Sequence, residues 1–148
     1  MGKYSLPKKE PVVSEENAHA QVMLIVERYN VNTDNMEEST AQATEQALDH
    51  VLDSIMSGWF QIENVDNEII VTQFIENKSA GSNVEKLVYG EMRFKHHQKM
   101  SEKAEGNKIR QAANLLRSMC KTPNGHLIID KLRASDANRA EFLSLLFL

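Results

Sequence analysis

Residues 69–75 are the feature that most limits how this chain can fold. They form a run rich in β-branched and aromatic side chains, which makes them the strongest strand in the sequence. Weaker strand-like runs at 59–63 and 84–89 flank them at short distances along the chain. Three strands joined by short loops predict an antiparallel meander, and their imperfect alternation places Val71 and Leu87 on the side of the core.

The residues before this sheet, 14–58, are predicted to be mainly helical. Asp34 and Glu37 have the spacing of a capping box, which predicts the start of a helix. We expect that helix to run to about Ser57 and to end at Gly58. Its apolar side chains form one stripe, which consists of Leu48, Val51, Leu52, Ile55 and Met56.

Residues 21–31 allow two interpretations. Their β-branched content favours a strand, whereas the length of the run also allows a helix. We expect a strand, which makes this stretch the exception in an otherwise helical region. Ser14, followed by two glutamates, is a candidate start for a helix just before it.

The C-terminal part of the chain shows helical patterns throughout. One helix is expected from residue 93 to the glycine at 106, and a second follows over 109–119. The loop at 122–125 is a clear stop signal, because it combines proline, asparagine and glycine. Ser135 or Asp136 is expected to cap a last helix.

These elements together predict an α+β fold. It consists of a small antiparallel meander of about three strands at 59–90, flanked by helices, and a helical C-terminal half at 91–148. We expect one domain over 14–148 and an extended N-terminal arm at 1–13, which holds two of the three prolines. A length of 148 residues and a mass of 16.8 kDa suit one domain with a short arm.

Composition excludes several classes of protein. Hydrophobic residues make up 41% and charged residues 26%, which is close to the globular average and not that of a disordered chain. The single cysteine excludes a disulfide-stapled secreted domain. No apolar run approaches the roughly 18–20 residues of a membrane span, and the first residues lack the apolar core of a signal peptide. We therefore expect no membrane partner.

Charge is distributed unevenly along the chain. Residues 1–90 hold 6 basic residues against 15 acidic ones, whereas residues 91–148 hold 11 against 6. The simplest interpretation of the basic segment 93–121 is a solvated helix face, and the alternative is contact with nucleic acid or an acidic partner. The sequence pI of about 5.7 differs from the strongly basic balance of most nucleic-acid-binding domains, so we expect no nucleic-acid partner.

The titratable residues give little sign of chemistry. The adjacent His96 and His97 have no further zinc ligands at helical spacing. Cys120 with His126 is best explained by a small apolar thiol at the end of a helix rather than by a nucleophile and its base. The six glycines form no phosphate-binding motif. We therefore expect a non-enzymatic protein without catalytic, cofactor-binding or metal-binding residues.

Two pairs near the first long helix are also read as structural. Asp49 and Asp53 lie one turn apart on a helix flank, where solvated carboxylates are the ordinary outcome. Trp59 and Phe60 form the only aromatic doublet and are expected to pack at the junction of helix and sheet.

The order of elements from residue 59 onward resembles that of the tail assembly chaperones of tailed bacteriophages. In that family a short β-meander leads into a basic helical segment, a second helix, a loop and a final capped helix. The matching segments here are the strand 69–75, EKLVY at 85–89 leading into EMRFK at 91–95, the helix 109–119, LRASD at 132–136 and EFL at 141–143.

The resemblance implies an interaction protein. Such chaperones coat apolar helices of the tape-measure protein until tube subunits polymerise around them. The expected partners are therefore phage tail proteins or a second copy of this chain, and the expected location is the host cytoplasm during assembly, or the virion. A permanent structural component of tail, baseplate or neck is the alternative, and a nucleic-acid-binding regulator acting through 93–121 is the third.

The last helix suggests where a partner binds. Phe142, Leu145 and Leu146 form one stripe that is expected to pack on the domain. Leu143 and Phe147 lie four residues apart on a different flank, which nothing further along the chain can cover, so we expect them to contact a partner. The basic residues Arg93, Lys95 and Lys99 complete the predicted partner-binding set.

Overall fold

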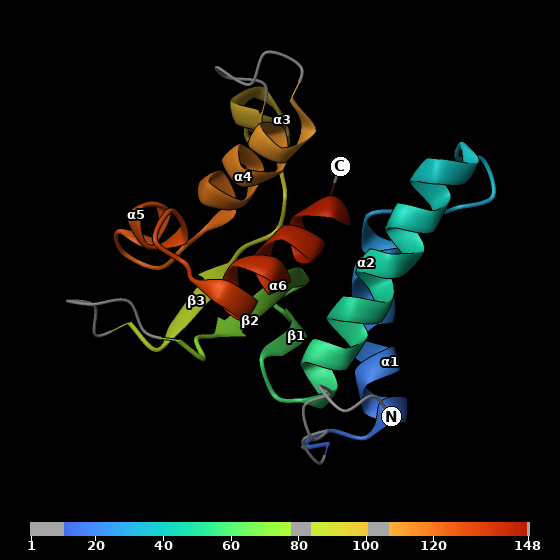
Figure 1. Cartoon of the computed structure of the whole chain (residues 1–148), viewed down its shortest axis with the longest axis horizontal. Helices are drawn as coiled ribbons and strands as arrows, with labels where there is room; N and C mark the ends of the chain where they lie inside the picture. The colour runs from blue at the N-terminus through green and yellow to red at the C-terminus, as the bar shows by residue number, and fades with distance from the viewer. Residues whose placement is uncertain (1–10, 78–83, 101–106, 148) are drawn as a thin grey trace, which may run out of the picture.

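The fold is α+β, as the sequence predicts. The structure is a computed structural model that describes residues 11–77, 84–100 and 107–147. Figure 1 shows its elements in chain order: α1 (Glu15–Arg28), α2 (Glu38–Met56), β1 (Phe60–Val65), β2 (Glu68–Phe74), β3 (Lys86–Tyr89), α3 (Phe94–Met100), α4 (Lys108–Met119), α5 (Gly125–Ile129) and α6 (Ala134–Leu145).

The three strands form the predicted antiparallel meander. Their order is β1-β2-β3, and the register aligns Ile62 with Val71 and Val71 with Tyr89. A two-residue turn joins β1 to β2, where Asp66 and Asn67 have φ angles of 50° and 64°. Positive φ at both turn positions matches the twist of the flanking strands, and aspartate and asparagine tolerate it well.

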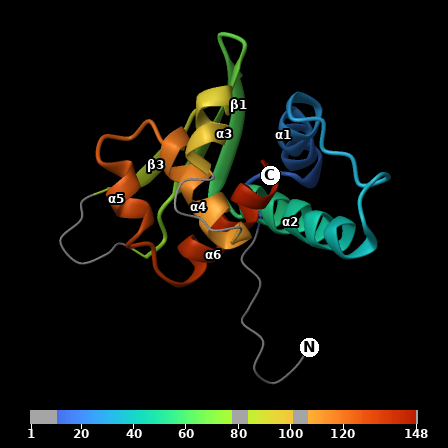
Figure 2. The ribbon, with the colours of Figure 1, turned by 90° about the horizontal axis from the view of Figure 1, so that it is seen from above.

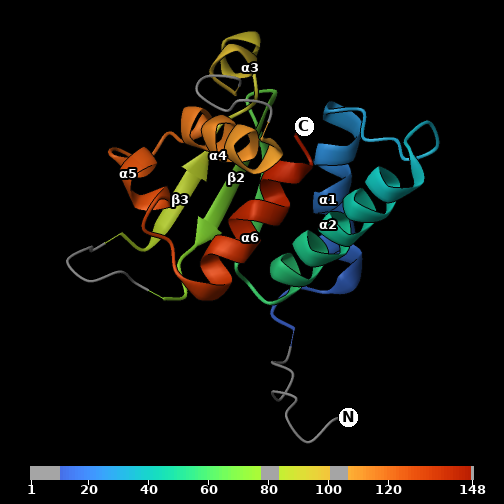
Figure 3. The same cartoon turned by 45° about the horizontal axis from the view of Figure 1, so that its top comes forward.

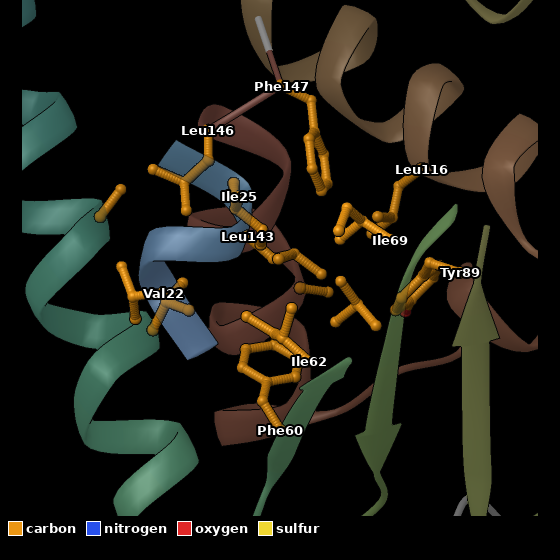
Figure 4. Packing of buried hydrophobic residues seen from close by; sticks show 14 of the residues in the cluster. Val22, Ile25, Phe60, Ile62, Ile69, Tyr89, Leu116, Leu143, Leu146 and Phe147 are labelled. Carbon is orange, nitrogen blue, oxygen red and sulfur yellow. The ribbon is translucent and has the colours of Figure 1, made fainter. Parts of the chain in front are cut away.

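One face of the sheet carries the core. Val71 and Leu87, predicted to point inward, are 2% and 0% exposed. Helices α4 and α6 lie across this face (Figure 3). Their buried side chains meet those of the strands and of α1, as the close view in Figure 4 shows.

The expected strand at 21–31 is wrong, because residues 21–28 belong to α1 and residues 29–31 form the turn after it. Ser14 caps the helix by accepting a hydrogen bond from the amide of Asn17 at 3.2 Å. The buried residues Ala18, Val22 and Ile25 recur at helical spacing, so a helix presents them all to the core at once. Helix α1 packs against both α2 and β1, and Figure 2 shows α1 and α2 on the β1 side of the sheet.

Helix α2 starts later than the capping box predicts. Its N-cap residue is Glu37, and Asp34 lies in the preceding turn, where its amide bonds to the side chain of Asn32 at 2.9 Å. The predicted end is confirmed, since the helix stops at Met56 and Gly58 has a φ of 85°. The core side of the helix consists of Thr44, Ala47, Val51, Ser54 and Ile55.

The C-terminal half is helical, with one correction at a helix start. The short helix α5 follows Asn124, which has a left-handed conformation at φ 59°. Arg133, rather than Ser135 or Asp136, is the N-cap residue of α6, and Asp136 lies in its first turn. The expected helical residues 101–106 lie outside the described part of the chain.

The outer edge of β3 is covered by the segment after α4. The amide of Gly90 donates to the carbonyl of Met119 at 2.8 Å, and the amide of Lys121 donates to the carbonyl of Val88 at 2.7 Å. The amide of Val88 in turn donates to the hydroxyl of Thr122 at 2.9 Å. These bonds satisfy backbone groups that a bare edge strand would leave open to pairing with another chain.

A series of buried hydrogen bonds links α6 to the sheet. The carboxylate of the fully buried Asp136 accepts hydrogen bonds from the amides of Glu76 at 2.9 Å and Asn77 at 2.7 Å, just beyond β2. The backbone carbonyl of Asp136 accepts a hydrogen bond from the side-chain amide of Gln73 at 2.9 Å. Gln73 accepts from the hydroxyl of Tyr89 at 2.8 Å, and burial raises the pKa of this tyrosine well above its ordinary value.

Replacing Asp136 with Asn is expected to destabilise the fold by about 1.5–3 kcal/mol. Both carboxylate oxygens of Asp136 accept a backbone N–H, and in the variant the side-chain NH2 group would face one of these donors. Urea unfolding measures the loss. The control is Asp130→Asn, which removes only an exposed ion pair with Arg117 and should cost about 0–1 kcal/mol. Equal losses in the two variants would refute the anchoring role of Asp136.

Replacing Val71 with Asp is expected to abolish cooperative folding, because a buried unpaired carboxylate costs several kcal/mol. Thermal melting followed by circular dichroism tests this. The matched control is Val65→Asp, since Val65 is 43% exposed at the end of β1. A Val71→Asp protein that melts like the control would reject the orientation of β2.

Candidate functional site

Leu143 and Phe147 do not form an uncovered flank, so that part of the prediction is wrong. They are 0% and 3% exposed, and Figure 4 shows both among the core side chains. The ring of Phe147 meets the ring of Tyr29 edge-to-face, with ring centres 5.0 Å apart. Tyr29 directly follows α1, and Val22 and Ile25 of this helix belong to the same buried cluster as Leu143 and Phe147. On the opposite flank, Phe142 and Leu145 are only half-buried.

The three predicted basic contact residues lie at and on α3. Arg93 directly precedes this helix and forms an ion pair with Glu68 at the start of β2, while Lys95 and Lys99 are exposed on the helix itself. Lys121 joins Glu68 from the other side at 3.4 Å, and its hydrogen bond and positive charge lower the pKa of the Glu68 carboxyl, with help from Arg93. The structure therefore separates this basic group from the buried pair at 143 and 147.

An apolar groove lies between α4, α5 and α6. It has a volume of about 160 Å³. Alanines on α4 and α6 leave this space because they are too short to fill it. The groove is lined by Ala112, Ala113, Leu116, Ile129, Leu132, Ala137, Ala140, Glu141 and Ser144.

Glu141 is the one charged residue among the described residues of the groove lining, and two basic residues are the sequence neighbours of Leu132. Lys131 and Arg133 are exposed and flank Leu132, which lines the groove between α5 and α6. Leu127 on α5 is 52% exposed, which is unusual for a large apolar side chain in the described part of this chain. An apolar hollow of this kind is suited to the apolar side chains of a partner segment.

A second, more polar cleft lies between α2 and α6. Its volume is about 290 Å³, and it is lined by His50, Asp53, Ser54, Ser57, Trp59, Ser135, Asn138, Arg139 and Phe142. The Arg139 guanidinium lies 4.8 Å from the centre of the Trp59 ring and pairs with Glu76 and Asp136, each at 3.4 Å. His50 stacks on Phe142 with ring centres 3.9 Å apart.

The aromatic doublet divides between core and cleft. Phe60 is 2% exposed and packs in the core as expected, whereas the half-buried Trp59 forms part of the polar cleft. Neither hollow is evident from the sequence, because neither is formed by neighbouring residues. The alanine pairs on α4 and α6 are the one sequence signal for the groove, since small residues at a helix crossing leave room.

The described residues contain no group of three or more histidine, cysteine, aspartate or glutamate side chains placed to hold a metal ion. His96 is buried, and its Nδ1 accepts the Arg93 amide at 2.8 Å, while burial raises the pKa of the half-buried Cys120 thiol. The side chains of His97 and His126 lie outside what the structure describes. Among the described helices, none combines the length and apolar character needed to cross a bilayer.

Comparisons with protein families, with curated proteins and with solved structures found no match to this chain. The chemistry of the two hollows and the sequence resemblance therefore carry the functional argument.

The basic segment 93–121 is expected not to bind DNA, because Arg93, Arg117 and Lys121 are already in ion pairs with carboxylates. A gel shift with arbitrary duplex DNA at physiological salt should show no complex at micromolar protein. A complex that weakens steeply as salt rises would overturn this expectation, since such a slope reports displaced counterions.

Proposed function

We propose that this chain is a non-enzymatic protein of phage tail morphogenesis that binds apolar helices of another tail protein, in the manner of a tail assembly chaperone. The observation that carries the proposal is the apolar groove between α4, α5 and α6. A helix laid in an apolar groove is a recurrent mode of peptide recognition, with anchors at i, i+3, i+4 and i+7. The sequence resemblance over residues 59–148 supports the same class of partner.

The border of the groove defines the preferred partner more closely. Lys131 and Arg133 stand beside Leu132, so acidic residues flanking the apolar anchors of a partner helix gain from them. The apolar lining supplies most of the affinity, because each buried leucine contributes about 1.5–3 kcal/mol. Charge then controls the association rate and its dependence on salt.

A permanent structural component of tail, baseplate or neck is the alternative within the same class. It uses the same groove but stays in the particle after assembly. Mass spectrometry of purified virions separates the two, since an assembly chaperone is absent from them and a structural component is present in fixed stoichiometry. The nucleic-acid-binding regulator ranks third, because three side chains of its basic segment are ion-paired.

Filling the groove is expected to abolish helix binding. In Ala137→Phe, a half-buried alanine of the lining becomes a side chain that occupies the hollow. The probe is a fluorescent amphipathic peptide with leucine at i, i+3, i+4 and i+7 and glutamate on its flanks, measured by anisotropy. We expect at least a tenfold loss of affinity, which corresponds to about 1.4 kcal/mol.

The matched control is Ala43→Phe, because Ala43 is an exposed alanine on α2. It should bind the peptide like the unchanged chain. A second peptide with lysine in place of glutamate should bind more weakly, and Lys131→Glu with Arg133→Glu should reverse that preference. Unchanged binding in Ala137→Phe would place the interface elsewhere.

A further inference from the structure

The N-terminal segment joins the fold beside the polar cleft between α2 and α6. The amides of Val12 and Val13 donate to the carbonyl of Met56 at 2.7 and 3.2 Å, and the Val12 side chain packs against Gly58. Ser57 and Trp59, on either side of this glycine, both line the cleft. Residues 11–13 of the predicted arm are therefore attached at the cleft, and residues 1–10 lie outside the described part of the chain.

Carboxylates lie on the α2 side of this cleft. Residues 11–77 contain 13 aspartates and glutamates against a single basic residue other than histidine, Arg28, which pairs with Glu91 at 2.7 Å. Asp53 lines the cleft, and Asp49 is exposed one turn earlier on α2. On the opposite wall, the positive charge of Arg139 is already balanced by Glu76 and Asp136.

The segment 1–10 has the opposite charge. It contains three lysines and one glutamate, together with Tyr4 and Leu6. Lys9 precedes Val12 by three residues and so lies within about 10 Å of it. Asp53 precedes Met56 by three residues of helix, or about 5 Å. A lysine side chain is long enough to span the remaining distance between Lys9 and Asp53.

We infer that the cleft between α2 and α6 is the docking site of residues 1–10 of the same chain. In this inference Lys8 and Lys9 pair with Asp53 and Asp49, and the apolar side chains of the segment pack on the half-buried ring of Trp59. Because the segment is tethered at Val12, its effective concentration is on the order of millimolar, so weak contacts are sufficient. Exposed ion pairs are screened, and the docking therefore loosens as salt rises.

Trp59 provides a direct readout, since it is the only tryptophan in the chain and lines the cleft. Deleting residues 2–10 is expected to shift its emission to longer wavelength and to increase quenching by iodide. A synthetic peptide of residues 1–10, added at millimolar concentration, should restore the original signal. Lys8→Glu with Lys9→Glu in the full chain should behave like the deletion.

The peptide should fail to restore the signal when the deletion also carries Asp53→Lys. The matched control is Asp34→Lys, which makes the same charge change at an exposed position before α2 and should leave restoration intact. Far-UV circular dichroism confirms that each variant is folded. Binding of the amphipathic peptide to the groove should be the same with and without residues 2–10, so this test and that of the proposed function fail separately.

Three results would overturn the inference. The first is identical Trp59 emission and quenching in the full and shortened chains. The second is a difference that neither the peptide nor Asp53→Lys affects. The third is a signal from the full chain that depends on protein concentration, because that dependence indicates docking of the segment from a second copy.

Discussion

The carboxylate of Asp136 is the contact on which the rest of the structure depends. It is fully buried, and its two oxygens accept hydrogen bonds from the two backbone amides just beyond β2. The backbone carbonyl of Asp136 accepts a hydrogen bond from the side chain of Gln73 in that strand. A buried charge is tolerated only when it is paired and hydrogen-bonded, so this position fixes the start of α6 against the end of the sheet in one arrangement. Arg139, one turn further along α6, supplies the opposite charge.

Fixing α6 in this way also creates both hollows. One flank of the helix, with Asn138, Arg139 and Phe142, forms a wall of the polar cleft against α2. The other flank, with Ala137 and Ala140, forms a wall of the apolar groove against α4 and α5. A change in the tilt of α6 would therefore alter the two hollows together, even though they differ in chemistry.

The charge asymmetry of the chain becomes partly internal in the folded protein. Glu68 at the start of β2 meets Arg93 and Lys121, and Arg28 at the end of α1 meets Glu91. These pairs join the acidic and basic parts of the sequence across the fold. Among the described residues, α2 keeps exposed carboxylates and α3 keeps exposed lysines.

The sequence by itself determined the meander and most of the helices, because strand composition, a two-residue Asp-Asn turn and stop signals act over a few neighbouring residues. The tertiary structure alone decided residues 21–31, where Val22 and Ile25 suit either a strand or a helix until α2 and β1 offer a surface to pack on. It also decided Leu143 and Phe147, because Tyr29, whose ring contacts Phe147, is more than 100 residues away in the chain. Local patterns cannot encode such contacts, and the groove and cleft, built from distant helices, depend on them for the same reason.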